Sequence, residues 1–503
     1  MQASYDVVIA GTGNAAFCAA HAARERGARV LMLEKAPEAW IGGNSYFTAG
    51  AYRVAFDSLD ELVALLADPS DERLARTDVP PYPAADFLAD LERVTEGRTD
   101  PVLAGVLVHD SLDTMRWLRD HGIRFQLQYD RQSFEIDGRF QFWGNLPLGT
   151  VGGGVGLIAQ HRAAAEAQGV EIRFETPVVW LLRDATGAVV GVVVDGPRGR
   201  EEIRAGAVVL ACGGFEADVR LRTMYLGSGW DVARVRGTPY NTGEGLHLAL
   251  EAGAEPYGHW SGCHSIQWDA GAPPFGDRTI TNHFSKQSYP IGIIVNAHGQ
   301  RFLDEGADFR NYTYARYGAE ILKQPGAIAW QLFDAKTTPL LRQDEYTAPG
   351  VSRIEADTIH ALAVALGIDP AALEKTVADF NAAVQPGPFN PAIKDGKRIM
   401  EHATNVAVVP ASFGWTDLGD WHSLADLLAP QQDANVAIGT EHLAEDTQRT
   451  LVFGNGRAVA TLGVEDLIIV DTDDVLLVCH RSRAQDVRRI VQRLRDRGQD
   501  HLC

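Results

Sequence analysis

Length, composition and charge limit what this chain can be. It has 503 residues, 46% of them hydrophobic, and a formal net charge of −20 at pH 7. At roughly 150 residues per domain, this length predicts about three folding units. The excess of acid argues against nucleic-acid binding, because phosphate backbones are bound by clusters of Lys and Arg. No apolar run reaches the roughly 18 to 20 residues that span a bilayer, so we expect a cytoplasmic protein without an integral membrane segment.

The cysteines predict neither a disulfide framework nor a metal or haem site. They are odd in number and widely scattered, with no CxxC or CxxCH spacing. We expect reduced thiols at all five positions: Cys18, Cys212, Cys263, Cys479 and Cys503.

The start of the chain predicts a βαβ unit that binds a dinucleotide. An apolar strand at 5–10 (YDVVIA) leads into GTGNAA, an Ala-rich helix and a second strand, ARVLMLE. Gly11 permits the tight turn, Gly13 lets the backbone approach a pyrophosphate, and Ala16 lets the helix pack closely on the strand. Glu34 ends the second strand, where an acid can accept hydrogen bonds from ribose hydroxyls. The alternative is that the glycines only form a tight turn.

Further glycine-rich segments favour a flavin over a nicotinamide nucleotide. Gly42, Gly43, Asn44 and Ser45 follow soon after the second strand. A strand is predicted at 175–182 (ETPVVWLL), and another, AVVLACGGFEAD (207–218), ends in Gly213 and Gly214, which allow close approach to a flat ligand. In RGTPYNTGEG (236–245), a further helix is predicted to open at Thr242, Gly243 and Glu244.

In this order, GTGNAA, GGNS, ACGGFE and NTGEG resemble the FAD-binding segments of the fumarate reductase and succinate dehydrogenase flavoprotein superfamily. GHWSGCHSIQWDAG (258–271) and RFLDEGADFRNYTYARYG (301–318) resemble its tricarballylate dehydrogenase branch. The resemblance implies an α/β fold: a Rossmann-like FAD-binding domain at 1–256 with an inserted α+β capping domain at 257–398. Because no histidine adjoins GGNS, we expect noncovalent FAD. The implied cofactor-binding residues are Gly11, Gly13, Ala16, Glu34, Lys35, Gly42, Gly43, Asn44, Ser45, Val178, Gly213, Gly214, Thr242, Gly243 and Glu244.

The resemblance also implies the chemistry: oxidation of a small polycarboxylate, of the tricarballylate to cis-aconitate type. FAD would accept the hydride and Arg310 the proton, with Glu305 or Asp308 as relay. His264 would hydrogen-bond a substrate carboxylate. The alternative for Arg310 is a structural salt bridge to one of those two acids. Extra positive charge in the cleft would come from Lys286, His283 and Arg316.

After residue 398 the resemblance changes. The glycine-rich segment that closes over the flavin in relatives has no counterpart, and 399–428 and 456–494 are instead similar to the C-terminal part of mannose-1-phosphate guanylyltransferases. Residues 399–503 therefore read as a small αβ module, with strands AVATLG, LIIVDT and VLLVCH and a helix from Arg483 to Arg495. Asp417 matches a metal-binding aspartate of that family, but the nucleotide loop is missing, so we predict no metal site and an apparent chimera.

Three hypotheses follow. The first is an FAD-dependent oxidoreductase acting on a polycarboxylate, with fumarate, succinate or 3-ketosteroids as alternative substrates and an unknown electron acceptor. The second is a sugar-nucleotide enzyme or binding module defined by the C-terminal segment. The third is a catalytically incomplete hybrid, because a sheet without its last strands leaves an unpaired edge.

Overall fold

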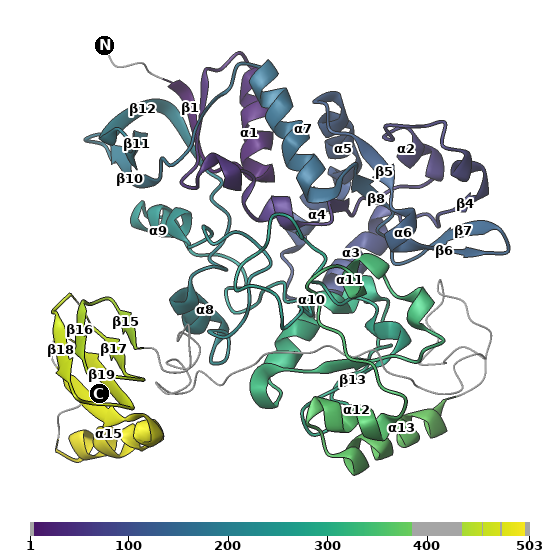
Figure 1. Cartoon of the computed structure of the whole chain (residues 1–503). Helices are drawn as coiled ribbons and strands as arrows, with labels where there is room; N and C mark the ends of the chain where they lie inside the picture. Colours follow the sequence, from purple (N-terminus) through teal and green to yellow (C-terminus); the bar gives the residue numbers. More distant parts are fainter. Residues whose placement is uncertain (1–4, 385–434, 455, 473–474, 498–503) are drawn as a thin grey trace. The chain divides into compact units, whose positions relative to one another are not determined.

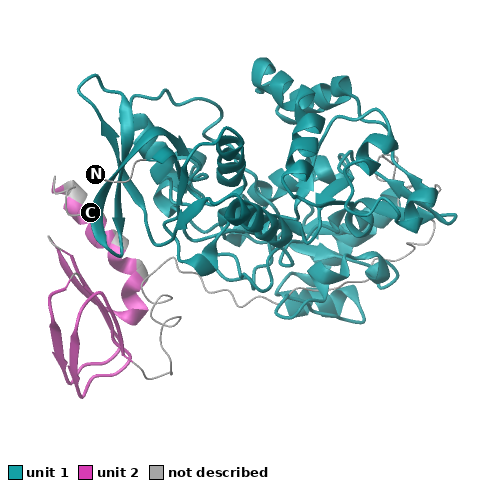
Figure 2. Ribbon diagram, turned by 90° about the horizontal axis from the view of Figure 1, so that it is seen from above, with its two compact units in different colours: residues 1–413 teal, residues 414–503 magenta. Residues whose placement is uncertain are grey.

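The computed structural model describes residues 5–384, 435–454, 456–472 and 475–497 (Figure 1). The chain divides into two compact units, Met1–Phe413 and Gly414–Cys503 (Figure 2). Asp417 lies outside the described residues. None of the helices within the described ranges is both long and apolar enough to cross a membrane.

A six-stranded sheet organises the N-terminal part of the first unit, in the order β10-β11-β12-β1-β2-β9. β12, β1, β2 and β9 run parallel, whereas β10, β11 and β12 pair antiparallel. The strands are β1 (Tyr5–Ala10), β2 (Val30–Leu33), β9 (Glu171–Arg173), β10 (Val178–Arg183), β11 (Val189–Gly196) and β12 (Gly199–Leu210). The predicted strand at 5–10 is confirmed, and the predicted strands at 28–34, 175–182 and 207–218 are found with shifted ends.

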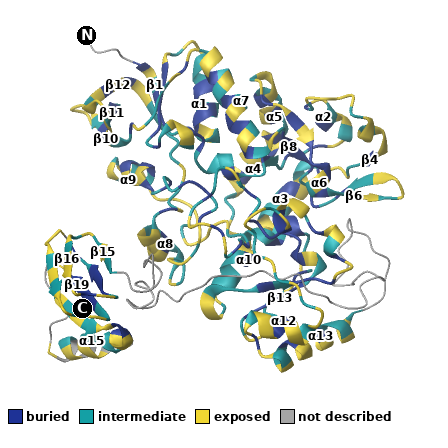
Figure 3. Cartoon of the chain, in the orientation of Figure 1, coloured by how far each residue is buried: buried dark blue, intermediate teal, exposed yellow. Residues whose placement is uncertain are grey.

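Helices cover this sheet because its central strands are apolar on both faces. On one face, Ile9 and Met32 pack with Phe17 of α1 (Asn14–Glu25) and Ile158 of α7 (Gly153–Ala167). The opposite face buries Val8 and Leu31 with Leu248 of α9 (Glu244–Glu251). Figure 3 accordingly shows β1 as largely buried. The predicted helices after Gly13 and at Glu244 are confirmed.

Residues 51–150 form a second layer beside the sheet, with their own core around Phe56, Leu62, Tyr82, Leu118 and Phe125. Two three-stranded sheets belong to it, β3-β8-β5 and β4-β7-β6. The elements are β3 (Ala51–Tyr52), α2 (Leu59–Val63), β4 (Thr77–Asp78), α3 (Ala84–Val94), α4 (Pro101–His109), α5 (Ser111–Asp120), β5 (Phe125–Leu127), α6 (Tyr129–Gln132), β6 (Ser133–Ile136), β7 (Arg139–Phe142) and β8 (Leu148–Thr150).

The region that follows α8 (Val219–Leu226) and α9 contains a small antiparallel sheet, β13 with β14, packed against helices around Ile293, Leu332, Leu362 and Leu373. Its elements are β13 (Ile293–Val295), α10 (Arg310–Leu322), β14 (Trp330–Leu332), α11 (Gln343–Tyr346), α12 (Ile359–Leu366) and α13 (Pro370–Ala383). The predicted start of the last helix is confirmed, since the Asp369 carboxylate accepts a hydrogen bond from Ala371 N–H and Pro370 is the first helical residue.

The second unit stacks short strands. β15, β17 and β19 pair in parallel, β20 pairs antiparallel with β19, and β16 pairs in parallel with β18. The elements are β15 (Val436–Ile438), β16 (His442–Glu445), β17 (Leu451–Phe453), β18 (Val459–Leu462), β19 (Leu467–Asp471), β20 (Leu476–His480) and α15 (Val487–Asp496). The three predicted strands are confirmed. The α-helix begins later than the predicted Arg483, because Arg481–Asp486 form 3₁₀ turns capped by the His480 side chain.

Candidate active site

A cavity of about 360 Å³ lies at the carboxyl ends of β1, β2 and β12. This is the end at which parallel sheets bind nucleotides. The predicted cofactor residues on its wall are Gly11, Gly13, Glu34, Lys35, Gly43, Asn44, Ser45, Val178, Gly213 and Glu244. The other five predicted cofactor residues adjoin residues of the wall: Ala16, Gly42, Gly214, Thr242 and Gly243. Ala16, for example, is buried where α1 packs on the sheet.

The turn between β1 and α1 requires glycine. Gly11 has φ +114°, and a Cβ there would lie 2.4 Å from the carbonyl oxygen of Ala211. α1 then begins at Asn14 with no acidic residue in its first turn. Asn14 N–H donates to Ser45 Oγ (3.1 Å). The positive end of the helix dipole can therefore receive an anion at this wall of the cavity.

Glu34 is held in place at the end of β2. Its carboxylate accepts hydrogen bonds from the Thr12 hydroxyl (2.6 Å) and from Ala36 N–H (2.9 Å). The Thr12 hydroxyl in turn accepts from Gly42 N–H (3.2 Å). These contacts join the first glycine turn, the end of β2 and the second glycine segment at one edge of the cavity.

On the other side, Lys35 links β2 to the start of α9. Its Nζ donates to the Thr242 hydroxyl (2.5 Å) and forms an ion pair with Glu244 (2.6 Å). Lys35 is thus brought together with two predicted cofactor residues that lie more than 200 positions later in the sequence.

Several wall residues were not singled out by the sequence: Thr12, Asn14, Trp40, Cys212, Thr238, Tyr240 and Asn241. Most adjoin the quoted glycine motifs, so their positions in the sequence were the available signal. Asn14 has a further contact: its Oδ1 lies 2.9 Å from His161 Nε2, and His161 Nδ1 lies 3.1 Å from His21 Nε2.

Arg310 is the first residue of α10 and is 5% exposed. Its guanidinium donates to neutral acceptors among the described residues: the side chains of Gln287, Gln132 and Asn311 and the carbonyl of Arg131. Burial lowers the pKa of Arg310 well below its ordinary value, and the charge of Arg342 lowers it further. The positive end of the α10 dipole acts in the same direction. This arginine is therefore easier to deprotonate than one in water.

The two predicted relay acids are paired with other arginines. Glu305 forms an ion pair with Arg301 and accepts from Ile294 N–H (2.7 Å). Asp308 forms an ion pair with Arg93. The carboxylate whose charge acts on Arg310 is instead that of Glu345, at the third position of α11.

Glu345 is the centre of a group that we call the arginine cluster: Arg131, Arg236, Arg310, Arg342, Asp344 and Glu345. Its carboxylate is fully buried and pairs with Arg131 (2.9 Å) and Arg342 (3.1 Å). Burial alone would raise the pKa of Glu345, but the charges of Arg342 and Arg131 hold it below its ordinary value. Arg131 also pairs with Asp344 (3.2 Å), which is 42% exposed. Sequence reasoning missed this cluster, because its members lie far apart in the chain.

His264 is an exposed residue whose ring centroid lies 5.1 Å from that of Tyr314. The surrounding protein nevertheless desolvates the imidazole, and this burial together with the charge of Arg236 lowers the pKa of His264 to about 4. The imidazole is thus neutral near pH 7.

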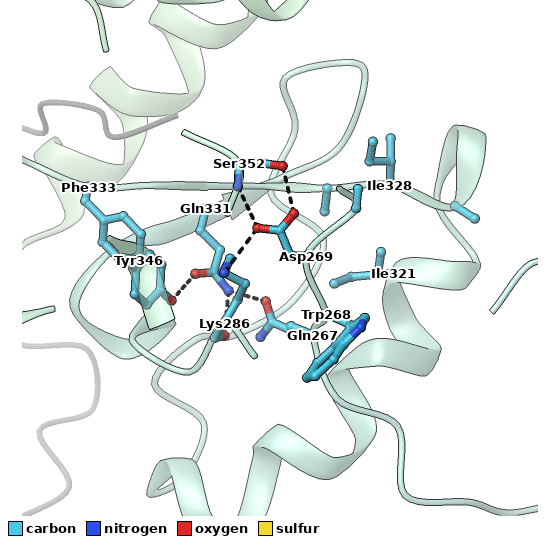
Figure 4. A pocket seen from close by; sticks show the side chains of 13 residues that line it. Gln267, Trp268, Asp269, Lys286, Ile321, Ile328, Gln331, Phe333, Tyr346 and Ser352 are labelled. Carbon is cyan, nitrogen blue, oxygen red and sulfur yellow. Dashed lines mark hydrogen bonds and ion pairs between the residues drawn. The ribbon is translucent and has the colours of Figure 1, made fainter. Parts of the chain in front are cut away.

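Lys286 belongs to a different cavity, of about 90 Å³, between β14, α10 and the loops around Asp269 (Figure 4). Its Nζ lies 3.2 Å from Asp269 Oδ2 and donates to the Glu345 carbonyl (2.6 Å). Asp269 also accepts from the Ser352 hydroxyl and N–H. The lysine charge is therefore compensated within this cavity. His283 lies 3.9 Å from Asp344, and Arg316 is exposed on α10.

Comparison with known proteins identifies the class of this site. The model of the FAD binding domain family matches residues 6–422, and that of the MannoseP isomerase/GMP-like beta-helix domain matches 440–494. The chain therefore belongs to the FAD binding domain family. It is similar to flavoprotein fumarate reductases over most of its length, and its C-terminal region is similar to mannose-1-phosphate guanylyltransferases.

Individual relatives support both parts. The chain is 29% identical over 388 residues to a probable fumarate reductase of Shewanella frigidimarina. The alignment covers 76% of this chain and 59% of that protein. It is similar to the open conformation of a flavocytochrome c3 fumarate reductase, with a TM-score of 0.56 and 26% identity over 81% of this chain and 66% of that one. The alginate biosynthesis protein AlgA of Pseudomonas aeruginosa is 39% identical over 100 residues, 20% of this chain and 21% of that protein. The chain thus spans about three fifths of the flavoprotein relative's length.

The residues that line this cavity fit FAD. The helix end of α1, without acidic side chains, suits the pyrophosphate, and Glu34 and Lys35 stand where β2 ends on the same wall. A Cβ on Gly13 would lie 3.5 Å from Ser45 Oγ and 3.8 Å from the Gly42 carbonyl, in the space between the two glycine segments. When bound, FAD would supply a two-electron acceptor.

Proposed function

We propose that the chain dehydrogenates a small polycarboxylate, of the tricarballylate to cis-aconitate type. A C–H bond on each of two adjacent carbons would break and a C=C bond form. FAD, held by the residues of the 360 Å³ cavity, would supply the hydride acceptor, and the Arg310 guanidine would take the proton. The observation that carries this proposal is the environment of Arg310: buried, bonded only to neutral acceptors in the described part of the chain, and lowered in pKa.

The other residues would bind and orient the substrate. His264, neutral near pH 7, would donate a hydrogen bond to a substrate carboxylate, and the guanidinium groups of the arginine cluster would offset the substrate charge locally. The local charge matters, because the chain as a whole has a net charge of −20 and would otherwise repel an anion.

A connected set of side chains would carry the proton from Arg310 towards solvent. Arg310 and Arg342 both donate to Gln287 Oε1, Arg342 pairs with Glu345, and Glu345 pairs with Arg131. Arg131 then reaches Asp344, which is half-exposed. We propose Glu345 as a relay residue; Glu305 and Asp308, the acids singled out by the sequence, remain alternative relays.

For the domains, we propose FAD binding by 1–256, substrate closure by 257–398 and a guanylyltransferase-like segment at 399–503. Polar contacts join the first two: Arg93 with Asp308, Arg131 with Glu345, and Arg236 with Asn282. A junction near Arg398 and Ile399 would make the chain a chimera.

A second candidate activity is fumarate reduction, which is favoured by the names of the flavoprotein relatives. It uses the same site in the opposite direction, with Arg310 donating the proton. A sugar-nucleotide activity of the C-terminal segment is favoured by the likeness to AlgA, which is limited to about the last fifth of the chain.

The test is anaerobic mixing of the FAD-loaded protein with tricarballylate. We expect loss of the oxidised flavin absorbance and formation of cis-aconitate. Reoxidation of the reduced protein by fumarate alone would favour the second candidate, and consumption of GTP with mannose-1-phosphate would favour the C-terminal one.

Replacing Arg310 tests its role. Arg310→Ala should keep its FAD and lose at least about 100-fold in turnover, the usual contribution of a proton-transferring group. Lys323→Ala, at the exposed end of the same helix, serves as the control. Turnover by Arg310→Ala at the parent rate would exclude proton transfer by Arg310.

A further inference from the structure

Arg236 lies where the FAD cavity meets the capping region. It precedes by two residues Thr238, which lines the FAD cavity and whose N–H donates to Asn44 Oδ1 (3.0 Å). In the other direction it donates to Asn282 of the capping region. Its charge lowers the pKa of His264, and it interacts electrostatically with Tyr314, which packs on that histidine.

Arg236 hydrogen-bonds a neutral group, without an acidic partner among the described residues. Its Nη1 donates to the Asn282 side-chain oxygen (2.9 Å). A guanidinium that is removed from water without a counter-ion loses hydration energy that an amide oxygen only partly restores. Burial accordingly lowers the pKa of Arg236. The position therefore favours an anionic ligand.

The charge balance of the arginine cluster leads to the same conclusion. Arg131 and Arg342 pair with Glu345, and Arg131 also pairs with Asp344. Four guanidinium groups thus meet two carboxylates. Within the described ranges, Arg236 and Arg310 form no direct ion pair with an acid, although the charge of Glu345 acts on both. The charge of Arg131 also acts on both of them, so Arg236 and Arg310 belong to one charged site. Their neutral hydrogen-bond partners differ: Arg236 donates to Asn282, whereas Arg310 donates to Gln287.

We propose that Arg236 binds the substrate carboxylate that lies outside the reacting C–C bond, and so selects tricarboxylates over dicarboxylates. This rests on the proposed function, in which Arg310 exchanges the proton at the reacting bond and His264 holds a carboxylate. A guanidinium presents paired N–H donors to a carboxylate, which makes this contact both strong and geometrically selective.

Two acids that differ in the outer carboxylate test the inference. Tricarballylate has it, and 2-methylsuccinate keeps the other two carboxylates but ends in a methyl group. Binding to the FAD-loaded full chain is measured from the flavin absorbance change. Arg236→Gln should weaken tricarballylate binding by about 10- to 100-fold, as expected for a charge-assisted hydrogen bond, and 2-methylsuccinate by less than about 3-fold.

Two further variants make the result decisive. Arg236→Lys keeps a cation and should bind tricarballylate more tightly than Arg236→Gln. It also gives a second measurement if Arg236→Gln folds poorly. Arg234→Gln, two residues earlier and bonded to the Ala272 carbonyl, should leave the ratio of the two affinities unchanged. If both Arg236 substitutions weaken the binding of the two acids equally, or weaken the binding of neither acid, the assignment of Arg236 is overturned. The proposed function is not affected by that result. Failure of the unsubstituted protein to bind either acid would instead overturn the proposed function, and the inference with it.

Discussion

At the scale of single residues, Glu345 controls the charge balance of the site. It is fully buried and pairs with two arginines, and its charge also acts on Arg310. A carboxylate at this position lowers the free-energy cost of burying several guanidinium groups, because each would otherwise be desolvated without a counter-ion. It also opposes the lowering of the Arg310 pKa by burial.

Neutralising Glu345 should therefore destabilise the protein. We expect Glu345→Gln to lower the free energy of unfolding by about 3 kcal/mol, since it leaves buried cations uncompensated. Chemical denaturation of the FAD-loaded protein measures the change. Glu320→Gln is the matched control: its partner Lys323 is exposed, so we expect a loss below about 1 kcal/mol. Similar losses for both variants would contradict the central position of Glu345.

Gly13 gives a second prediction at this scale. Its φ of −78° is open to any residue, so a substitution acts through space rather than through backbone strain. In Gly13→Val, the branched side chain would fill the gap between the glycine segments, and we expect folded protein that is purified without FAD. The absorbance near the flavin bands, relative to that of the protein, measures this. Gly105→Val, where a Cβ meets nothing within 4 Å, should keep its flavin.

At the scale of elements, two buried histidines join α1 to α7. His21 and His161 are inaccessible to solvent, bond each other, and connect through Asn14 to the wall of the FAD cavity. Burial lowers the pKa of His161 to about 3 and also lowers the pKa of His21. Both are thus neutral in the folded protein, and this contact between helices depends on that state.

The pH dependence of stability follows from this pair. Below an ordinary histidine pKa of about 6.5, the unfolded chain takes up protons that the folded chain excludes, so stability falls as the pH falls from 6.5 towards 3. Each such histidine contributes a slope of up to about 1.4 kcal/mol per pH unit. Urea unfolding between pH 5 and 7 should show a shallower slope for His161→Gln than for the parent. Parallel slopes would show that His161 is not held neutral.

At the scale of the whole molecule, the FAD cavity belongs entirely to the first compact unit. A ligand that binds only the folded state stabilises the part that holds it, by about 2.7 kcal/mol at a concentration 100 times its Kd. We expect added FAD to slow hydrogen exchange in β1, α1 and β12 and to leave β17 and β19 unchanged. Equal protection of both units would show that they unfold as one.

Local sequence patterns determined several of the observed strands, turns and helix starts. The apolar run at 5–10, the glycine turn after it and the Asp-Pro start of α13 each dictate their own structure, because strand, turn and cap preferences depend on a few neighbouring residues. The glycine segments also indicated the nucleotide wall, since only residues without side chains allow the backbone to approach a ligand.

The charged centre of the site was decided by the tertiary structure alone. Arg131, Arg236 and Glu345 carry no motif of their own, and they meet only when α6, the segment after α8 and α11 converge. The pKa shifts of Arg310 and His264 likewise depend on burial and on charges contributed from distant segments. The sequence by itself determined which nucleotide class is bound, through local backbone geometry. Which charged side chains meet in the arginine cluster depended on long-range packing, which no short pattern encodes.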